Sequence, residues 1–230
     1  MKQPASSFNL YGDTGRYGTK SFGVNVSAER LDWLDLRTLE YVIRCTGASI
    51  NGLDLGCGLG TPSLAFGIAG ARMHLIDIGD LSHRFEMLAA EIPIAGLRFT
   101  RQDLNTINAS VLGEEYQFCY SQRTIHYLQF ANAVNLLRLV ASRMEPGAPL
   151  WLSASGAESE LGEGYQARHQ PLESRFGRLA SAMAQKHQIF APLCLYSEPD
   201  LIRLGETSGF KPVELKKSAF GNIKGIFEKC

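Results

Sequence analysis

Three glycines alternate with other residues directly after a short apolar run, in the segment 53–60 (LDLGCGLG). Glycine is needed where a backbone turns sharply or approaches a ligand that a Cβ atom would block. Such a turn between a strand and a helix is typical of nucleotide-binding α/β folds. The dinucleotide pattern GxGxxG is absent, because Thr61 or Ser63 stands where its third glycine would be. The turn therefore suits a ligand with an ammonium group and a sugar but without a pyrophosphate.

Apolar runs and amphipathic stretches alternate on both sides of this turn. The runs with strand character are 53–55, 73–78, 97–101, 117–121 and 149–153. The stretches with helical character are 62–70, 81–91, 107–112 and 129–144, preceded by a helix from the cap residue Ser27 to about Cys45. Strands and helices at this spacing predict right-handed crossovers and a doubly wound, mainly parallel α/β sheet.

The final third of the chain has a different pattern. The stretch 156–169 is polar and rich in glycine, which predicts a mobile loop, and Pro171 opens a helix whose apolar residues extend to Phe190. A helix over 198–208 follows, and the runs 210–215 and 223–228 predict a C-terminal antiparallel hairpin. We expect a single domain over 1–230 with seven strands.

Two segments of this domain are candidates for contact with a substrate. Residues 1–26 predict a flexible N-terminal arm, because turn residues are dense there while aromatic residues are frequent. This arm either frays or folds over a ligand. Residues 156–190 are predicted to form a substrate lid. The alternative interpretation is that the apolar residues of this segment pack into the ordinary core.

Composition narrows the classes of partner. The 23 basic residues balance the 23 acidic ones, whereas proteins that bind phosphate backbones usually carry a basic excess. We therefore expect a small-molecule or protein substrate and no nucleic acid. The five cysteines form no CxxC pair, and no apolar run is long enough for a membrane span or secretory signal. These features indicate reduced thiols and a cytoplasmic location.

Acidic residues follow three consecutive predicted strands. Asp54 lies in the first strand, Asp77 ends the second and Asp103 follows the third. Ligands of open parallel sheets bind at the carboxyl ends of the strands, where a carboxylate accepts hydrogen bonds from ribose hydroxyls. Each aspartate taken alone has an alternative role as a helix cap or turn residue, but the ordered set of three favours a ligand site.

The glycine turn with these acids resembles motif I and the following motifs of class I S-adenosylmethionine-dependent methyltransferases, which have a Rossmann-like fold. The sequence motifs of the family match residues 50–155. Beyond these residues, the resemblance lies in the order of the predicted helix and hairpin at the end of the chain. It implies S-adenosyl-L-methionine as cofactor, with its methionine portion over Asp54, Gly56, Gly58 and Gly60. It also implies Asp77 and Ile78 at the ribose and adenine, and Asp103 and Leu104 at the adenine edge.

The fourth strand lies where this family holds the transferable methyl group. The Asn/Asp-Pro-Pro-Tyr/Phe turn of DNA amine methyltransferases is absent, and no cysteine has the proline context of a cytosine nucleophile. The continuation 122–127 (QRTIHY) is similar to small-molecule methyltransferases of the ubiquinone-biosynthesis type. His126 is either a general base or a packing residue, and Arg123 either holds a substrate carboxylate or pairs at the surface. Tyr120 either walls the cofactor site or is a core aromatic residue.

The sequence thus predicts a methyltransferase that acts on a small-molecule acceptor without a metal ion. The acceptor atom (oxygen, nitrogen or carbon), the acceptor itself and the oligomeric state stay open. One alternative is methylation of a protein or RNA side group. Another is a partner subunit that binds the cofactor without turnover. Loss of the glycines of the turn or of the three acidic residues would indicate such a subunit.

Overall fold

The computed structural model describes residues 22, 31–45, 47, 49–94, 96–113 and 115–230. Apart from Phe22, the arm predicted over 1–26 lies outside these residues, as does Ser27. No helix among the described residues is long and apolar enough to cross a membrane. The five cysteines carry no disulfide; Cys57, Cys119 and Cys194 are buried, whereas Cys45 is half-buried and Cys230 is exposed.

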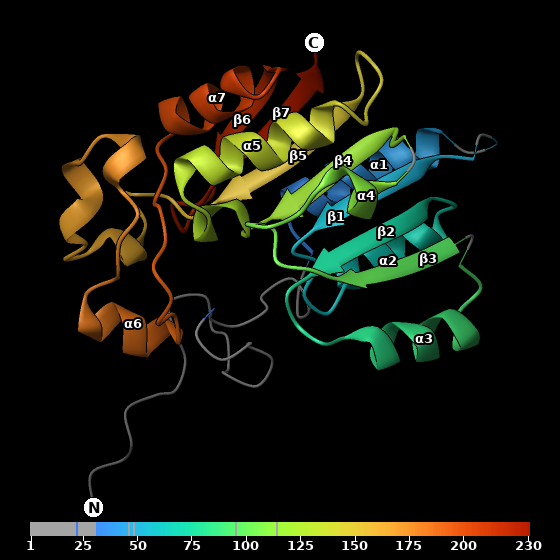
Figure 1. Cartoon of the computed structure of the whole chain (residues 1–230), viewed down its shortest axis with the longest axis horizontal. Helices are drawn as coiled ribbons and strands as arrows, with labels where there is room; N and C mark the ends of the chain where they lie inside the picture. The colour runs from blue at the N-terminus through green and yellow to red at the C-terminus, as the bar shows by residue number, and fades with distance from the viewer. Residues whose placement is uncertain (1–21, 23–30, 46, 48, 95, 114) are drawn as a thin grey trace, which may run out of the picture.

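The described strands form one seven-stranded sheet in the order β3-β2-β1-β4-β5-β7-β6 (Figure 1). Strands β1 to β5 pair in parallel, and β7 runs antiparallel to both of its neighbours. The doubly wound, mainly parallel sheet with a C-terminal antiparallel pair is therefore confirmed. The strands are β1 (Asn51–Leu55), β2 (Arg72–Asp77), β3 (Gly96–Arg101), β4 (Phe118–Gln122), β5 (Pro149–Ala154), β6 (Phe210–Lys217) and β7 (Ile223–Lys229).

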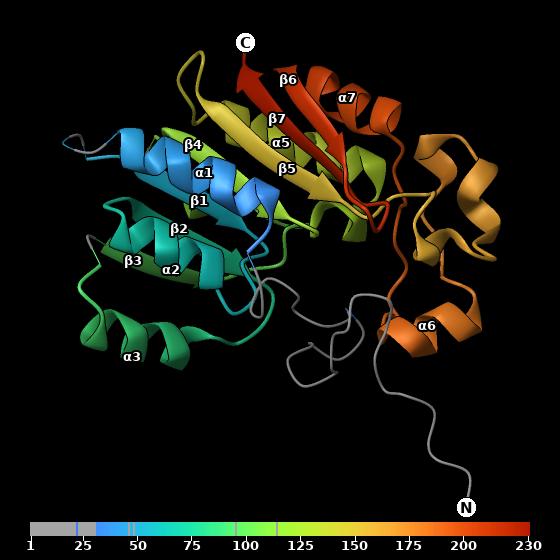
Figure 2. The same cartoon turned by 180° about the vertical axis from the view of Figure 1, so that it is seen from behind.

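Helices cover both faces of the sheet. One face carries α4, α5 and α7, and the opposite face carries α1, α2 and α3 (Figures 1 and 2). The α-helices are α1 (Trp33–Arg44), α2 (Thr61–Ile68), α3 (Ser82–Glu91), α4 (Ala109–Leu112), α5 (Phe130–Ala141), α6 (Ser181–His187) and α7 (Glu198–Thr207). This arrangement leaves the carboxyl ends of β1 to β5 along one edge, where the predicted ligand residues lie.

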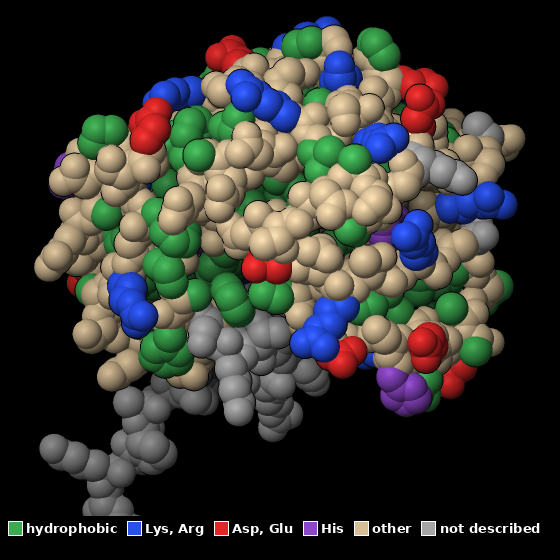
Figure 3. Space-filling view, in the orientation of Figure 1, with side chains coloured by type: hydrophobic (Ala, Val, Ile, Leu, Met, Phe, Trp, Pro, Cys, Tyr) green, Lys and Arg blue, Asp and Glu red, His purple; other side chains and the backbone are tan. Residues whose placement is uncertain are grey.

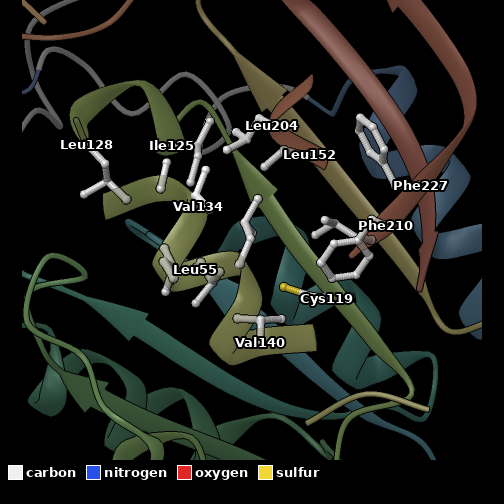
Figure 4. Packing of buried hydrophobic residues seen from close by; sticks show 14 of the residues in the cluster. Leu55, Cys119, Ile125, Leu128, Val134, Val140, Leu152, Leu204, Phe210 and Phe227 are labelled. Carbon is white, nitrogen blue, oxygen red and sulfur yellow. The ribbon is translucent and has the colours of Figure 1, made fainter. Parts of the chain in front are cut away.

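Each face of the sheet packs a core of its own. Against α5 and α7 the core includes Val134, Leu152 and Phe210, all buried (Figure 4). Against α1, α2 and α3 it includes Leu34, Phe66 and Phe85. Burial on both faces explains why the strands read as continuous apolar runs rather than as alternating patterns.

Helix α1 begins later than the sequence predicted. Residues 31 and 32 are not helical, so the helix does not start at Ser27. Asp32 caps it: its Oδ1 accepts a hydrogen bond from the Leu34 amide at 2.8 Å, and Asp35 Oδ2 accepts one from the Asp32 amide at 2.6 Å. This reciprocal capping box satisfies two amides that have no partner within the helix.

The segment between β5 and α7 (residues 155–197, the β5–α7 segment) corrects a second prediction. The continuous helix from Pro171 to Phe190 is wrong, because only Leu172–Ser174 and Ser181–His187 are helical. Gly177 instead exchanges two backbone hydrogen bonds with Leu193, which forces an extended stretch between the two helical turns. The apolar spacing that suggested one helix packs a small separate core.

The same small core contradicts the mobile loop that was predicted over residues 156–169. Leu161 and Tyr165 are buried in it together with Leu179 and Leu193, and the Tyr165 hydroxyl donates to the Leu193 carbonyl at 2.7 Å. Two short 3₁₀ turns replace the open loop that the polar composition predicted. In Figure 1 the β5–α7 segment lies beyond the carboxyl end of β5.

The core between the sheet and α7 gives a stability test. The Phe227 ring is fully buried, and a Cβ atom on Gly205 would lie 2.5 Å from it. Phe227→Ala should lower the free energy of unfolding by about 3–5 kcal/mol, measured by urea denaturation, because it removes a packed ring. Val213→Ala, at a side chain that is 56% exposed on the neighbouring strand, should change it by less than about 0.5 kcal/mol. Equal losses in both variants would contradict this packing.

Candidate functional site

The glycine turn forms a backbone cradle at the carboxyl end of β1. Gly56, Gly58 and Gly60 have φ angles of 73°, 52° and 74°, in the left-handed region that favours glycine. A Cβ atom on Gly56 would lie 2.2 Å from Thr124, and one on Gly60 would lie 2.5 Å from Phe85. The turn therefore presents main chain without side chains, which lets a ligand approach the backbone closely.

Asp77 connects this turn to the end of β2. Its Oδ2 accepts a hydrogen bond from the Gly58 amide at 2.9 Å, and its Oδ1 accepts one from the Gly79 amide at 2.8 Å. A carboxylate has about four lone-pair sites, so two of them can still accept hydrogen bonds from a ligand. The neighbouring Ile78 side chain is 45% exposed. The pair thus combines a charged acceptor with an apolar surface.

Asp54 lies beneath the turn rather than on its surface. It is 1% exposed, and its Oδ2 accepts a hydrogen bond from the Ser63 hydroxyl at 2.5 Å, while its Oδ1 has no partner among the described residues. Burial, reinforced by the charges of Asp77 and Asp35, raises the pKa of Asp54 to about 7. A buried oxygen without a donor suits a cationic ligand close to the turn.

The third aspartate continues the row of strand ends. Asp103 follows β3 by two residues, and its Oδ1 accepts hydrogen bonds from the backbone and side-chain nitrogens of Asn105 at 2.9 and 3.0 Å. The Gln102 amide donates to the Asp77 carbonyl at 2.8 Å, which joins the ends of β2 and β3. Leu104 is mostly buried in the core beneath them. The structure thus brings the predicted cofactor residues of β1, β2 and β3 to one edge.

Tyr120 lies beside Asp54 in the sheet, but its side chain belongs to the core. Its side chain is fully buried on the α1 face, stacked edge-on against Phe66, and its hydroxyl donates to Asp35. Burial and the Asp32 charge raise the pKa of Asp35 to about 6, although the hydrogen bond from Tyr120 and the Lys224 charge act in the opposite direction. These contacts favour the core interpretation of Tyr120.

No short motif in the sequence indicates the polar network beside Tyr120. The Asp32 carboxylate accepts hydrogen bonds from Gln122 of β4 at 2.7 Å and from Lys224 of β7, whose side chain is 8% exposed. Both partners lie near the carboxyl ends of β4 and β5, because Gln122 and Lys224 each pair with Ser153. The network fixes the first turn of α1 at the ligand edge. From the sequence alone, an isolated lysine in a terminal strand, such as Lys224, is expected to be exposed to solvent.

His126 lies in a short 3₁₀ turn (Ile125–Tyr127) after β4, and its side chain is fully buried. Its two ring nitrogens face Ser155, at 3.3 Å from the amide nitrogen and 3.4 Å from the hydroxyl. Burial, with a smaller effect of the Arg123 charge, lowers the pKa of His126 to about 3. A histidine that weakly basic is neutral at pH 7, and its contacts favour the packing interpretation over a general base.

Arg123 has an unusual backbone. Its φ angle is 55°, one of two left-handed angles at non-glycine residues in the described part of the chain. Its amide donates to the Ser153 carbonyl at 3.2 Å and to the Ser153 hydroxyl at 3.0 Å. A left-handed non-glycine residue costs about 1–2 kcal/mol, and strain of this kind concentrates at functional sites. The chain therefore turns outward at the end of β4.

Phe22, the described residue of the predicted arm, joins two other segments. Its carbonyl accepts a hydrogen bond from the Tyr127 hydroxyl at 2.5 Å, and the two rings meet edge-on at 5.1 Å. Phe22 also forms a β-bridge with Ile189, directly after α6. Three segments far apart in the sequence thus meet at one place beside the ligand edge.

The described residues contain no group of three or more His, Cys, Asp and Glu side chains suited to a metal ion. On the face seen in Figure 3, lysines and arginines are interspersed with acidic side chains. That face shows no basic stripe of the kind that tracks a phosphate backbone.

Comparison with known proteins agrees with this geometry. A family model described as a methyltransferase domain matches residues 30–215. No curated protein matches the sequence significantly.

Solved structures share the fold. One is a 1,6-didemethyltoxoflavin-N1-methyltransferase from Burkholderia thailandensis, with bound 1,6-didemethyltoxoflavin and S-adenosylhomocysteine; it is 15% identical, with a TM-score of 0.63 over 89% of this chain and 81% of that one. An S-adenosylmethionine-dependent methyltransferase from Mesorhizobium loti is 16% identical, with a TM-score of 0.62 over 85% and 98%. The magnesium protoporphyrin IX methyltransferase of Synechocystis PCC 6803, with bound SAM, is 13% identical, with a TM-score of 0.56 over 87% and 86%.

The raised pKa of Asp54 gives a test of the site's electrostatics. Its carboxyl group binds a proton more tightly in the folded protein, with a pKa of about 7, than at its ordinary value of 3.8. Between those values the folded state holds more protons, so this group's contribution to stability is lost as the pH rises from about 4 to about 7. The unfolding free energy of the wild type should therefore fall relative to that of Asp54→Asn over this range. Urea denaturation at a series of pH values measures the difference, and a difference independent of pH would contradict the assignment.

Proposed function

The chain belongs to the methyltransferase domain family, and we propose that it transfers a methyl group from S-adenosyl-L-methionine to a small-molecule acceptor. The observation that carries this proposal is the glycine cradle joined to a strand-end carboxylate. Gly58 donates its amide to Asp77, so the turn and the acid are held at a fixed distance. The cradle binds an amino acid and a nucleoside side by side, without a pyrophosphate between them.

The residues present fit the cofactor. Gly56 and Gly60 let the turn pack closely against Thr124 and Phe85, which holds its main chain in place for the methionine portion, and the unpartnered oxygen of Asp54 suits the positive charge there. Asp77 offers free lone pairs to the ribose hydroxyls, and the exposed side chain of Ile78 offers an apolar surface to the adenine. Asp103 and Leu104 are assigned to the adenine edge on the family pattern.

S-adenosylmethionine supplies an electrophilic methyl group on its sulfonium when bound. The task of this chain is then to orient the acceptor for an in-line displacement and to exclude water. We assign the second task to the β5–α7 segment, which contains the predicted lid over 156–190. Its Ile189 forms a β-bridge with Phe22, whose carbonyl accepts a hydrogen bond from Tyr127 in the turn after β4.

The small-molecule class rests on two supports. The structural neighbours from Burkholderia and Synechocystis are named for methylation of a toxoflavin precursor and of magnesium protoporphyrin IX. The balanced charge and the mixed surface give no sign of a nucleic-acid partner. We propose a cytoplasmic location, since the cysteines carry no disulfide. The acceptor atom is left open.

The cofactor assignment predicts the relative affinities of the protein for several nucleotide ligands. In titration calorimetry, S-adenosylmethionine or S-adenosylhomocysteine should bind in the micromolar range, and NAD and ATP should bind far more weakly, because the cradle lacks the third glycine of the dinucleotide pattern. Equal or tighter binding of NAD would overturn the proposed function.

Asp77 should contribute to that affinity through its charge. Asp77→Ala removes charge-assisted hydrogen bonds worth about 1.5–3 kcal/mol, which corresponds to a loss of cofactor affinity of about tenfold to a hundredfold. Asp80→Ala is the matched control, because that nearby carboxylate is exposed and pairs with Arg101. Circular dichroism checks that both variants fold. An unchanged dissociation constant in folded Asp77→Ala would assign Asp77 to the turn alone.

A further inference from the structure

The carboxyl group of Asp54 is only partly satisfied by its surroundings. The side chain is 1% exposed, and its Oδ1 accepts no hydrogen bond from any described residue. The Ser63 hydroxyl, in the first turn of α2, donates to the other oxygen at 2.5 Å. An ionised oxygen that is removed from water without a replacement partner is costly, so buried oxygens of this kind are rare. The carboxyl group therefore requires either a proton or a positively charged partner.

The charged groups that face Asp54 are acidic. After burial, which has the largest effect, the negative charges of Asp77 at the end of β2 and of Asp35 in α1 raise the pKa of Asp54. Among the described residues, no lysine, arginine or histidine contacts its carboxylate. The ammonium group of Lys224 is paired with Asp32 and lowers the pKa of Asp35. The chain thus places three carboxyl groups beside the glycine turn without a cation against the buried one.

The other titratable groups around Asp54 are neutral. Burial raises the pKa of the Cys57 thiol in the turn and of the Cys119 thiol in β4, and the charge of Asp54 raises both further. Burial also raises the pKa of Tyr120, with further contributions from the charges of Asp35 and Asp54. These three groups keep their protons at pH 7, and none of them carries a positive charge.

A proton is therefore what neutralises Asp54 in the protein without ligand. With a pKa of about 7, the carboxyl group holds its proton in about half of the molecules at pH 7 and in most of them at pH 6. An opposite charge within about 4–6 Å favours the ionised form of a carboxyl group. The proton of Asp54 and a cation at the glycine turn consequently compete with one another.

We propose that Asp54 exchanges its proton for the amino group of the bound cofactor, so that binding of the ammonium group at the glycine turn ionises the carboxyl group and releases the proton to the solvent. One positive charge then replaces another beside the buried carboxylate. Ser63 is a positioning residue, because its hydroxyl holds the carboxyl group and favours the ionised form. This inference rests on the proposed function and adds a proton that leaves when the cofactor binds.

Calorimetry of the full-length protein, in buffers with different ionisation enthalpies, counts the protons that each ligand releases. The probe is S-adenosylhomocysteine, and the control ligand is 5′-methylthioadenosine, which has the same nucleoside thioether without the amino-acid part. At pH 6.5 the probe should release about half a proton to one proton more than the control ligand. Its affinity should rise by up to about tenfold per pH unit between about pH 5.5 and pH 7, and level off above about pH 8.

Three variants separate the proton exchange from folding. Asp54→Asn keeps an acceptor for Ser63 but has no proton to exchange, so it should abolish the difference in proton release between the two ligands. Ser63→Ala removes a hydrogen bond that lowers the pKa of Asp54, so proton release should extend to higher pH. A merely structural role of the Ser63 hydroxyl would not move the pH profile.

Ser121→Ala is the matched control. Its buried hydroxyl donates to the Leu55 carbonyl at 2.9 Å, and its side chain points to the face of the sheet opposite to that of the neighbouring Tyr120. This variant should keep the wild-type pH profile. Circular dichroism checks that all three variants fold.

Three results overturn the proposal in a protein that binds S-adenosylhomocysteine. The first is equal proton release by the two ligands, which would place the proton on a group that faces the nucleoside. The second is an excess release that persists in folded Asp54→Asn. The third is an affinity for S-adenosylhomocysteine that does not change between pH 5.5 and pH 7. Failure of S-adenosylhomocysteine itself to bind would instead count against the proposed function.

Discussion

The hydrogen bonds that Asp77 accepts from Gly58 and Gly79 hold the ligand edge together. They add to the backbone hydrogen bonds that the Gly56 and Cys57 amides donate to the Ile76 carbonyl, and together these bonds join the turn after β1 to the end of β2. Gly58 offers its amide from a left-handed backbone conformation. Because the same carboxylate keeps lone pairs for the ribose hydroxyls of the proposed cofactor, one group serves both the fold and the proposed binding site.

The same edge places several carboxyl groups close together beneath the helices. Asp54 and Asp35 are both buried, and burial is the main reason that the pKa of each is raised. Tyr120 and Ser63 donate hydrogen bonds to them, but neither donor is a cation. Burial of these acids is costly, and the charge of Lys224 offsets that cost only in part for Asp35. Binding of a cationic ligand at the glycine turn would offset part of that cost.

The sequence was sufficient for the sheet and for most of the helices, because the glycine turn and the apolar runs are local signals. It failed where the decisive contact is distant. The extended stretch at Gly177 depends on Leu193. The start of α1 is a different case, because its capping box is local, and the sequence offers two possible cap residues, Ser27 and Asp32. The strand-end acids were placed correctly at one edge, whereas the buried contacts of Tyr120 and His126 come from α1 and from Ser155, which no short motif encodes.

The ion pair between Asp32 and Lys224 joins residues 192 positions apart. During synthesis, the first turn of α1 leaves the ribosome long before its partner in β7 exists, so an early nascent chain holds an unanchored helix start. Closing so long a loop is entropically costly and becomes favourable only when β7 docks between β5 and β6. The contact that holds the first turn of α1 to β7 is therefore among the last to form, after almost the whole chain has been made.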